Sequence, residues 1–592
     1  MEQTQRQPLG FGKTMLASAL GVIIASAILS IIGFLLMVGM LASAVASSKD
    51  SATPIVGDHI FLKIDLSKTY QERTPDQFTT LFGDDKVGGF CDLLAAIEKA
   101  KTDSKIDGLY IYATAASGMS WGQTEELRNA VKDFIDASGK PVVAYGDSYS
   151  QSGYYLASVA NKTAIHPSGM VDFRGIGAQV MYYKDLLDKF DIKIDLIRPE
   201  SNAYKSAGET YIRNNMSDAN RIQIRTYITS IWNHVTEGIA AQRNLTVNQV
   251  NEIADNLSGY LANDAVNQRL IDTMLFENDI KTILKKDYGC KRIVSTSKYA
   301  KSITPNKSKN KIAVIYAEGD VVDGKSNGYQ TAVYSDDIVE AFEQAAKDKD
   351  VKAIVLRVNS PGGSVTASEA MTHAIMKAKK SKPIIVSMSD LAASAGYEIS
   401  CNATKIVAQP TTITGSIGVF ATIPEIGDLL NKKLGIHIDT VCTNKNADGL
   451  NVMHSLSPTA RAMMQRNVED FYVTFCQRVA KGRGMRVAQV DSIAKGRVWT
   501  GADAIKIGLV DTLGGFDVAL SIAAKEAGIS DYTTTSYPKQ GDVMTRLFKM
   551  ADDEDVKLEQ RLNAIIPFYS DMRYWANMAP LQARLPYAIE IK

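Results

Sequence analysis

Three short apolar stretches in the second half of the chain decide its fold class. They are KIAVIYAEGDVV at residues 311–322, AIVLRV at residues 353–358 and PIIVS at residues 383–387. Each is rich in β-branched residues and ends in small or polar ones, which is typical of a buried strand. The segments between them, DIVEAFEQAAKDK (337–349) and SEAMTHAIMKAKK (368–380), show helical patterns. Strands that alternate with helices predict an α/β fold with a mostly parallel sheet.

The first half of the chain repeats this order of elements. A helical pattern, LLAAIEKAKTD (93–103), is followed by the strand pattern GLYIY (108–112). A second helical pattern, ELRNAVKDFID (126–136), is followed by the strand pattern PVVAY (141–145). The first half is therefore predicted to form a second α/β unit of the same kind.

An internal repeat with a period of about 240 residues supports this prediction. The segment LANDAVNQRLIDTM (261–274) aligns with TGADAIKIGLVDTL (500–513). Further matches keep almost the same offset: Gly153-Tyr154 with Gly396-Tyr397, Gly175-Ile176-Gly177 with Ser416-Ile417-Gly418, and Ser217 and Arg221 with Ser457 and Arg461. Solenoid repeats are about 20–50 residues long, so this pattern indicates a duplicated domain.

The polar, basic segment SKYAKSITPNKSKNK at residues 297–311 is predicted to be the linker between the two units. The N-terminal domain is then expected at residues 49–296 and the C-terminal domain at residues 312–537. A C-terminal extension, residues 538–592, belongs to neither copy. It is rich in aromatic residues and proline near its end. Three roles stay open for it: capping a core, packing on a partner subunit, or touching the membrane. Subunit packing is the default, and we assign the extension no chemistry.

Composition excludes several classes of protein. A chain of 592 residues is too long for a single small binding module, and 45% apolar with 22% charged residues is typical of globular protein. The 66 basic and 65 acidic residues leave no basic excess for binding nucleic acid. The five cysteines form no CxxC pair, so neither a disulfide framework nor a metal site is indicated.

One segment departs from this average. No charged residue occurs from Thr14 to Ser48, a stretch longer than the roughly 20 apolar residues that cross a bilayer. A cleaved signal peptide is the alternative, but its apolar core is only about 7–15 residues long. We therefore predict a membrane anchor at residues 14–48. Arg6 and Lys13 precede it, which predicts a cytoplasmic tail at residues 1–13 and translocation of the rest of the chain.

Candidate catalytic residues lie where two predicted strands of the second unit end, which is where function collects in open α/β sheets. Pro361-Gly362-Gly363 makes a tight turn with exposed backbone N–H groups after the first of these strands. After the second, the segment SDLAASAGY places Ser394 among very small side chains near a helix start. Read alone each signal is weak, because such turns and helix-capping serines are common.

A serine nucleophile needs a base. The chain has six histidines, at positions 59, 166, 234, 373, 437 and 454, and none lies between His373 and His437. The sequence therefore offers no histidine close to Ser394 along the chain that would indicate a Ser-His-Asp triad. The other base available to such enzymes is a lysine kept neutral by burial, which can lower the pKa of its amine by about 3–5 units. Spacing alone does not identify which lysine.

The motifs LRVNSPGGS (356–364), SMSDLAASAGYEIS (387–400), PTTITGSIGVF (410–420) and AYKSAGETYIRNNMS (203–217) closely resemble signal peptide peptidase A (protease IV) of the long, duplicated bacterial type. The resemblance covers nearly the whole chain, including the apolar N-terminal segment and the repeat. It implies two crotonase-like domains of the Clp-protease superfamily and a Ser-Lys dyad. It further implies no metal or cofactor, and an assembly of four chains.

Carried over residue by residue, the resemblance makes Ser394 the nucleophile and Lys205 the general base. Ser416 would orient the lysine, and the backbone N–H groups of Gly363 and Ala395 would form the oxyanion hole. Whether Lys205 reaches Ser394 within one chain or from a neighbouring subunit stays open.

The first copy is expected to lack a nucleophile of its own. Gln151 aligns with Ser394, and Ser152, one position later, would point elsewhere. At the repeat offset of 240 residues Lys445 overlies Lys205, and three explanations stay open: a vestige of the duplication, a surface lysine, or a slip of the alignment at this place. The neighbours of Lys445 are typical of a solvated loop, where it would stay protonated. The first copy is therefore expected to contribute Lys205 to the site in the second copy.

The resemblance thus implies a membrane-anchored serine endopeptidase that degrades signal peptide remnants and other hydrophobic peptides. Its location would be the bacterial inner membrane, with one membrane pass and both domains on the periplasmic side. Two alternatives remain open at this point: a crotonase-type enzyme acting on acyl-CoA thioesters, and a catalytically inactive membrane scaffold.

Overall fold

The computed structural model describes residues 57–538, except residues 75–87, 116–117, 305, 327–330 and 450, together with residues 581–584 and positions 21 and 32. The predicted tail (1–13) and nearly all of the predicted anchor (14–48) therefore lie outside the described residues. Within the described part of the chain, no helix is both long and apolar enough to span a bilayer.

The helices of the first half are α3 (Phe90–Thr102), α4 (Trp121–Ser138), α5 (Gln151–Ala157), α6 (Lys184–Lys189), α7 (Glu209–Ile212), α8 (Asp218–Arg243), α9 (Val247–Asn256), α10 (Ala262–Asn267), α11 (Glu277–Asp287) and α12 (Thr296–Ser302). Its strands are β1 (Ile60–Asp65), β2 (Ile106–Ala113), β3 (Val142–Gly146), β4 (Lys162–Ile165), β5 (Lys193–Ile197), β6 (Thr273–Met274) and β7 (Arg292–Ser295).

The helices of the second half are α13 (Ser335–Lys347), α14 (Val365–Lys379), α15 (Ala395–Glu398), the π-helix η1 (Leu429–Lys433), α16 (Pro458–Arg483), α17 (Val487–Ile493), α18 (Gly501–Ala504) and α19 (Phe516–Glu526). Its strands are β8 (Lys311–Glu318), β9 (Asp320–Val322), β10 (Ala332–Tyr334), β11 (Val351–Ser360), β12 (Gly362–Ser364), β13 (Ile384–Ala393), β14 (Lys405–Ala408), β15 (Ile413–Gly415), β16 (Phe420–Glu425), β17 (Val498–Thr500), β18 (Thr512–Leu513), β19 (Thr533–Tyr537) and β20 (Leu581–Arg584).

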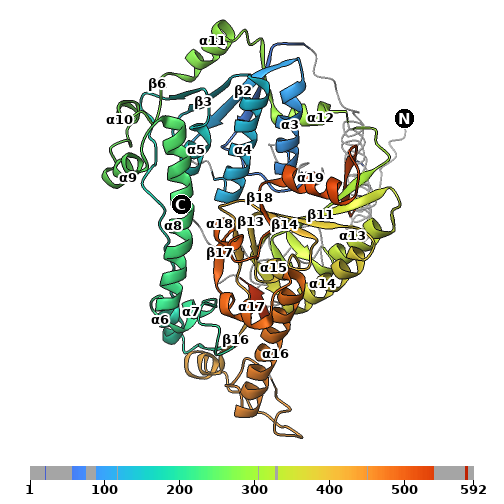
Figure 1. Cartoon of the computed structure of the whole chain (residues 1–592). Coiled ribbons are helices and arrows are strands. Elements are labelled where there is room, and N and C mark those ends of the chain that lie inside the picture. The colour runs from blue at the N-terminus through green and yellow to red at the C-terminus, as the bar shows by residue number, and fades with distance from the viewer. Residues whose placement is uncertain are drawn as a thin grey trace, which may run out of the picture.

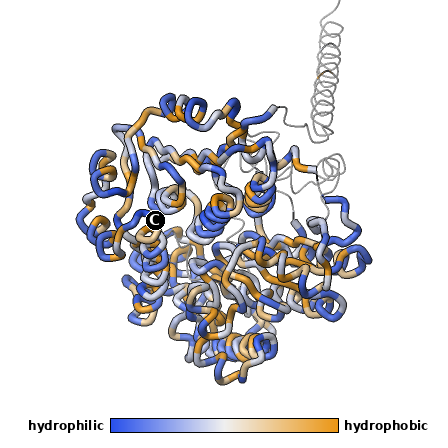
Figure 2. The backbone as a smooth tube through the Cα atoms, turned by 45° about the horizontal axis from the view of Figure 1, so that its top comes forward, coloured by the Kyte–Doolittle hydropathy of each residue, from blue (hydrophilic) through white to orange (hydrophobic). Residues whose placement is uncertain are grey.

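Each half of the chain builds a central, mostly parallel sheet, as the strand and helix patterns predict. The first sheet has the order β6-β4-β3-β2-β1-β7, and the second has the order β17-β15-β13-β11-β8-β19 with β14 beside β13. The strands are buried on both faces, which explains their continuous apolar runs. Figure 1 shows the two units one above the other, and Figure 2 shows the hydrophobic stretches gathered in their interiors.

The repeated motifs have the same structural role in both units. Tyr154 and Tyr397 donate their hydroxyl hydrogens to the carbonyls of Leu270 and Leu509, respectively. The matched serines cap the two 26-residue helices: Ser217 accepts from the N–H of Asn220 at α8, and Ser457 accepts from the N–H of Ala460 at α16. The sequence repeat therefore records a repeated set of hydrogen bonds, and each cap is worth about 1 kcal/mol.

The first unit continues into the range predicted as linker. Residues 296–302 form α12, which packs on α3, and the buried Tyr299 donates its hydroxyl hydrogen to Asp103. The preceding strand β7 pairs with β1 in the first sheet. The polar and basic composition of residues 297–302 reflects the exposed face of this helix, so composition alone does not mark the end of the unit.

A buried ion-pair network joins the two units. The guanidinium of Arg357, on β11, contacts Glu72 at 2.8 Å and Glu126 at 2.7 Å, and both carboxylates come from the first unit. Arg357 also donates to the hydroxyls of Ser387 and Ser389 on β13. All these side chains are buried. Removing one partner of such a network would leave a buried charge without compensation, which fixes how the units pack.

A third sheet, β10-β9-β12-β20-β16-β5, draws strands from three parts of the chain. Strand β5 belongs to the first half by sequence, yet it pairs antiparallel with β16 of the second unit from Ile197↔Ala421 to Lys193↔Glu425. Figure 1 shows the consequence, because α6 and α7 lie at the far end of the long helix α8, next to β16. This exchange carries the chain after β5 into the second unit.

Candidate active site

Ser394 lies at the end of β13 and occupies the N-cap position of the short helix α15, where its side chain makes no capping hydrogen bond. Its backbone has φ 55° and ψ −117°, a conformation that costs free energy for a residue with a side chain. The Ser394 N–H donates to the carbonyl of Gly415 at 2.8 Å, which holds the turn. Its neighbours must be small, because a Cβ on Gly396 would lie 2.8 Å from the Ser360 carbonyl oxygen. The serine is fully buried in this chain.

Lys205 lies in the loop between β5 and α7, and the structure brings it to Ser394. Its Nζ is 2.8 Å from the Oγ of Ser394 and 3.1 Å from both the Oγ and the carbonyl oxygen of Ser416. The residue is fully buried, and burial lowers the pKa of its amine well below the ordinary value. The arrangement supplies a hydroxyl beside an amine whose neutral form can accept its proton.

Three contacts hold the Lys205 backbone in place. The guanidinium of Arg198 donates to the Lys205 carbonyl at 2.8 Å, and the N–H of Tyr204 donates to the carbonyl of Lys495 at 3.1 Å. Gly496 packs so closely that a Cβ there would lie 2.5 Å from the Lys205 Cβ. Its φ of +77° also favours glycine. The lysine is therefore clamped between strand β5 and the loop before β17.

The loop that contains Ser416 supplies two contacts that the sequence did not predict. Besides the hydroxyl, the backbone carbonyl of Ser416 accepts from Lys205, and the carbonyl of Gly418 lies 3.4 Å from the Ser394 Oγ. Ser416 has φ 51°, and its N–H donates to the carbonyl of Arg497. Backbone acceptors carry no residue-type signature; the one available signal was the Gly-Ser-Ile-Gly turn itself.

The two predicted oxyanion donors lie on adjacent segments. Gly363, in β12, has φ +156°, and a Cβ there would lie 2.1 Å from the carbonyl oxygen of Val321 on β9. Ala395 directly follows Ser394 and begins α15, so its N–H has no carbonyl partner within that helix. Helix α15 packs on β12. The backbone N–H groups named from the sequence thus come from neighbouring segments beside Ser394.

The corresponding position in the first unit is closed by a side chain. Gln151 Oε1 accepts from the N–H groups of Arg174 and Gly175, and its Nε2 donates to the Gly175 carbonyl. Gly175 is the repeat partner of Ser416. In the first unit the Gln151 amide therefore links directly the two positions that, in the second unit, are linked through the Lys205 amine. Ser152 is half-buried on α5.

Lys445 lies on an exposed turn, as predicted for a solvated loop. The segment before Lys445 shows that the offset between the two copies is not constant. DLLDKFDIKID (185–195) matches DLLNKKLGIHID (428–439) at an offset of about 243–244 residues. Continued from there, this offset places Lys445 opposite Ser201. At Ser217 and Ser457 the offset is again 240, so the second copy is four residues shorter between these two matched segments, which is where Lys205 and Lys445 lie.

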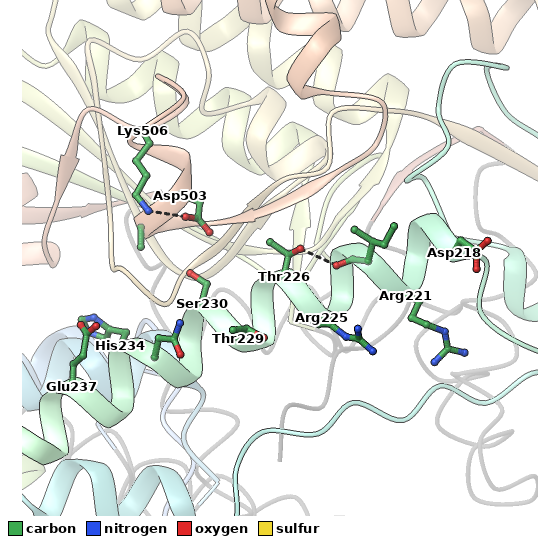
Figure 3. Close-up of a pocket in the computed structure, with 13 residues that line it drawn as sticks. Asp218, Arg221, Arg225, Thr226, Thr229, Ser230, His234, Glu237, Asp503 and Lys506 are labelled. Atoms are coloured by element: carbon green, nitrogen blue, oxygen red, sulfur yellow. Dashed lines mark hydrogen bonds and ion pairs between the residues drawn. The ribbon is translucent and has the colours of Figure 1, made fainter. Parts of the chain in front are cut away.

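A separate pocket of about 990 Å³ lies along α8 (Figure 3). It is lined by one face of that helix, from Asp218 to Glu237, and by Ala502, Asp503 and Lys506 near α18. Lys506 forms an ion pair with Asp503 at 3.0 Å at its edge. None of the predicted site residues lines it, so it is not the candidate active site. In the described residues, no cluster of His, Cys, Asp or Glu has a geometry that could hold a metal ion.

Comparisons with known proteins agree with the duplication. The model of peptidase family S49 matches residues 135–291 and again residues 376–530, and the Clp protease model matches residues 308–413. Protease 4 of Salmonella typhi is 37% identical over 490 residues, covering 80% of this chain and 78% of its own. Protease 4 of Haemophilus influenzae is 33% identical, covering 83% of both chains. The chloroplastic serine protease SPPA of Arabidopsis thaliana is 29% identical, covering 73% of this chain and 64% of its own.

We predict that Gly496→Ala displaces Lys205, because the new Cβ would meet the Lys205 backbone N at 2.6 Å. The rate at which a serine-directed phosphonate labels Ser394 should fall on the order of a hundredfold. Gly484→Ala is the matched control: that glycine has φ +64° at the end of α16, with open space around it. The control should lose about 1–2 kcal/mol of stability and keep its labelling rate. Equal labelling of the two variants would contradict the prediction.

Proposed function

Since the chain belongs to peptidase family S49 and is a serine peptidase, we propose that it hydrolyses peptides through a dyad of Ser394 and Lys205 within one chain. The observation that carries this proposal is the 2.8 Å contact between the Lys205 Nζ and the Ser394 Oγ. Burial supports the same assignment, because it lowers the pKa of the Lys205 amine.

In the proposed mechanism the neutral amine of Lys205 takes the proton of the Ser394 hydroxyl as its oxygen attacks the peptide carbonyl. The oxyanion accepts hydrogen bonds from the backbone N–H groups of Gly363 and Ala395. The protonated Lys205 then gives its proton to the leaving amine, and the C–N bond breaks to leave an acyl ester on Ser394. Water, deprotonated by Lys205, hydrolyses this ester. Ser416 keeps the amine directed at Ser394.

The proposed substrates are signal peptide remnants and other hydrophobic peptides, as the family resemblance implies. The small apolar residues beside Ser394, which are alanine and glycine on a buried strand end, support this proposal. The two alternatives are less well supported. An inactive scaffold would not need an amine held beside a serine, and family S49 contains peptidases rather than acyl-CoA enzymes.

We further propose that residues 14–48 anchor the chain in the inner membrane with one pass, and that both units lie on the periplasmic side. The absence of charge from Thr14 to Ser48 supports the anchor. The basic residues before it support the orientation.

Self-association into a tetramer is also proposed, and the internal repeat supports it. Within the chain, β5 of the first unit pairs with β16 of the second. The repeat counterpart of β5 is residues 437–441, where Ile438 is 46% exposed, and the preceding Ile436 is 50% exposed. The counterpart of β16 is residues 179–183, where Met181 is exposed. Pairing these two segments between neighbouring chains would repeat the internal contact and can close a ring.

We predict that Ser394→Ala and Lys205→Met each abolish peptide hydrolysis. The first removes the nucleophile and the second removes the base without opening a cavity. The loss should exceed about a thousandfold in kcat/KM, measured with a quenched fluorescent peptide. Ser152→Ala is the control, because it changes the serine next to the aligned position of the first unit, and it should keep full activity. Hydrolysis that survives Ser394→Ala would disprove the dyad.

The pH profile should show a single rise governed by Lys205. A protonated ammonium cannot accept the serine proton, so kcat/KM increases as pH rises through the pKa of Lys205. Because burial lowers that pKa from its usual value of about 10.4, the plateau should be reached well below about pH 10. A profile that is flat from about pH 5 to about pH 9 would argue against a lysine base.

We predict that Ile438→Pro reduces the size of the assembly measured by light scattering, because proline removes a strand N–H donor. The residue is half exposed in the single chain, so the fold should be retained. The control is Met463→Lys, which changes another exposed apolar residue without altering the backbone. Lysine is used there because a proline at position 463 would disrupt α16. An unchanged mass for Ile438→Pro would contradict the proposed pairing.

A further inference from the structure

The C-terminal extension contributes a strand to the edge of the candidate active site. Strand β20 lies between β12 and β16 and runs antiparallel to both. Its register sets Ala583 opposite Gly363 and Arg584 opposite Gly362. Gly363 is the residue proposed to donate to the oxyanion. An extended segment that completes a sheet at this place binds as a peptide substrate would by strand addition.

Arg584 of this strand forms an ion pair with Asp320 on β9. Arg584 Nη2 lies 2.9 Å from Asp320 Oδ2, and the two side chains are only 24% and 19% exposed. Asp320 is the first residue of β9, which pairs with β12 through Val321 and Gly363. The carboxylate therefore comes from a strand that is fixed directly against the one carrying the proposed oxyanion donor.

The neighbouring charged side chains have other partners, and Asp320 is the carboxylate that contacts β20. Asp323 accepts from the hydroxyls of Ser364 and Thr366, where α14 begins, and so serves that helix start. Lys325 forms an ion pair with Glu340 at 3.1 Å. An ion pair between partly buried groups held by rigid strands is stronger than one between flexible exposed side chains.

We propose that Asp320 forms a subsite for a basic side chain of a peptide that pairs with β12 as β20 does, at the position opposite Gly362. Arg584 fills this subsite in the chain itself. The inference rests on the proposed function and adds one feature to its substrates: an arginine or lysine next to the residue that pairs with Gly363. An otherwise apolar peptide with a basic residue at that place is favoured over the same peptide without it.

The test uses two peptides as competitors of a neutral quenched reporter peptide, with the full chain as the enzyme. One has the sequence of residues 578–587, MAPLQARLPY, and the other replaces its arginine with glutamine. The arginine peptide should inhibit at a concentration about three- to tenfold lower. The chain's own strand β20 competes equally with both peptides. The ratio of the two inhibition constants therefore does not depend on the fraction of molecules in which β20 is paired with β12.

Variants of Asp320 then assign the preference to this side chain. Asp320→Asn should bring the ratio close to one, and Asp320→Lys should favour a third peptide with glutamate in place of the arginine. Asp350→Asn is the matched control, because that carboxylate is exposed and pairs with Lys311 at the opposite end of the sheet. It should keep the wild-type ratio.

Two results would overturn the proposal. One is equal inhibition of the wild-type chain by both peptides, and the other is an unchanged ratio of the two inhibition constants in Asp320→Asn. Failure of the proposed function is a different outcome, because the reporter would then not be hydrolysed by the wild-type chain. In that case direct binding of fluorescently labelled forms of the two peptides to the same chain measures the same ratio. A ratio near one in that assay would also overturn the subsite.

Discussion

The burial of one amine is the constraint on which this molecule depends. An ammonium taken out of water is costly, so the fold can hold Lys205 only in a neutral form or among acceptors. The Oγ of Ser394 and both oxygens of Ser416 surround its Nζ within 3.1 Å. The same burial that makes this residue expensive for folding lowers the pKa of its amine, which a base working near neutral pH requires.

Holding that amine requires both halves of the chain to be fixed relative to each other. The exchange of β5 onto β16 carries Lys205 across, and Gly496 and Lys495 clamp its backbone from the other side. On the far side of the sheet, Arg357 binds Glu72 and Glu126 of the first unit. A buried arginine between two carboxylates contributes little net stability, but it strongly disfavours any other packing of the units.

Duplication explains why one site needs two units. The hydrogen bonds that build each unit are retained in both copies, as the pairs Tyr154 and Tyr397 show. The proposed chemistry is divided between them. The first unit has Gln151 at the position of Ser394, and the amide of Gln151 binds the backbone of Arg174 and Gly175. The hydrogen bonds of the fold are thus present in both copies, whereas the proposed dyad is formed once, from one residue of each copy.

The sequence by itself determined the α/β class, the duplicated unit and the serine at the end of a strand, because these follow from local patterns: apolar runs, a repeat, and small residues around Ser394. It also identified Lys205 and Ser416, but only through resemblance to a family, since no spacing links residues 189 positions apart. Only the tertiary structure brought the amine to the hydroxyl, because the pairing of β5 with β16 is a contact between distant strands. The same holds for the strand at residues 581–584, whose four residues carry too little pattern to predict their partner, and for the carboxylate of Asp320 that meets it.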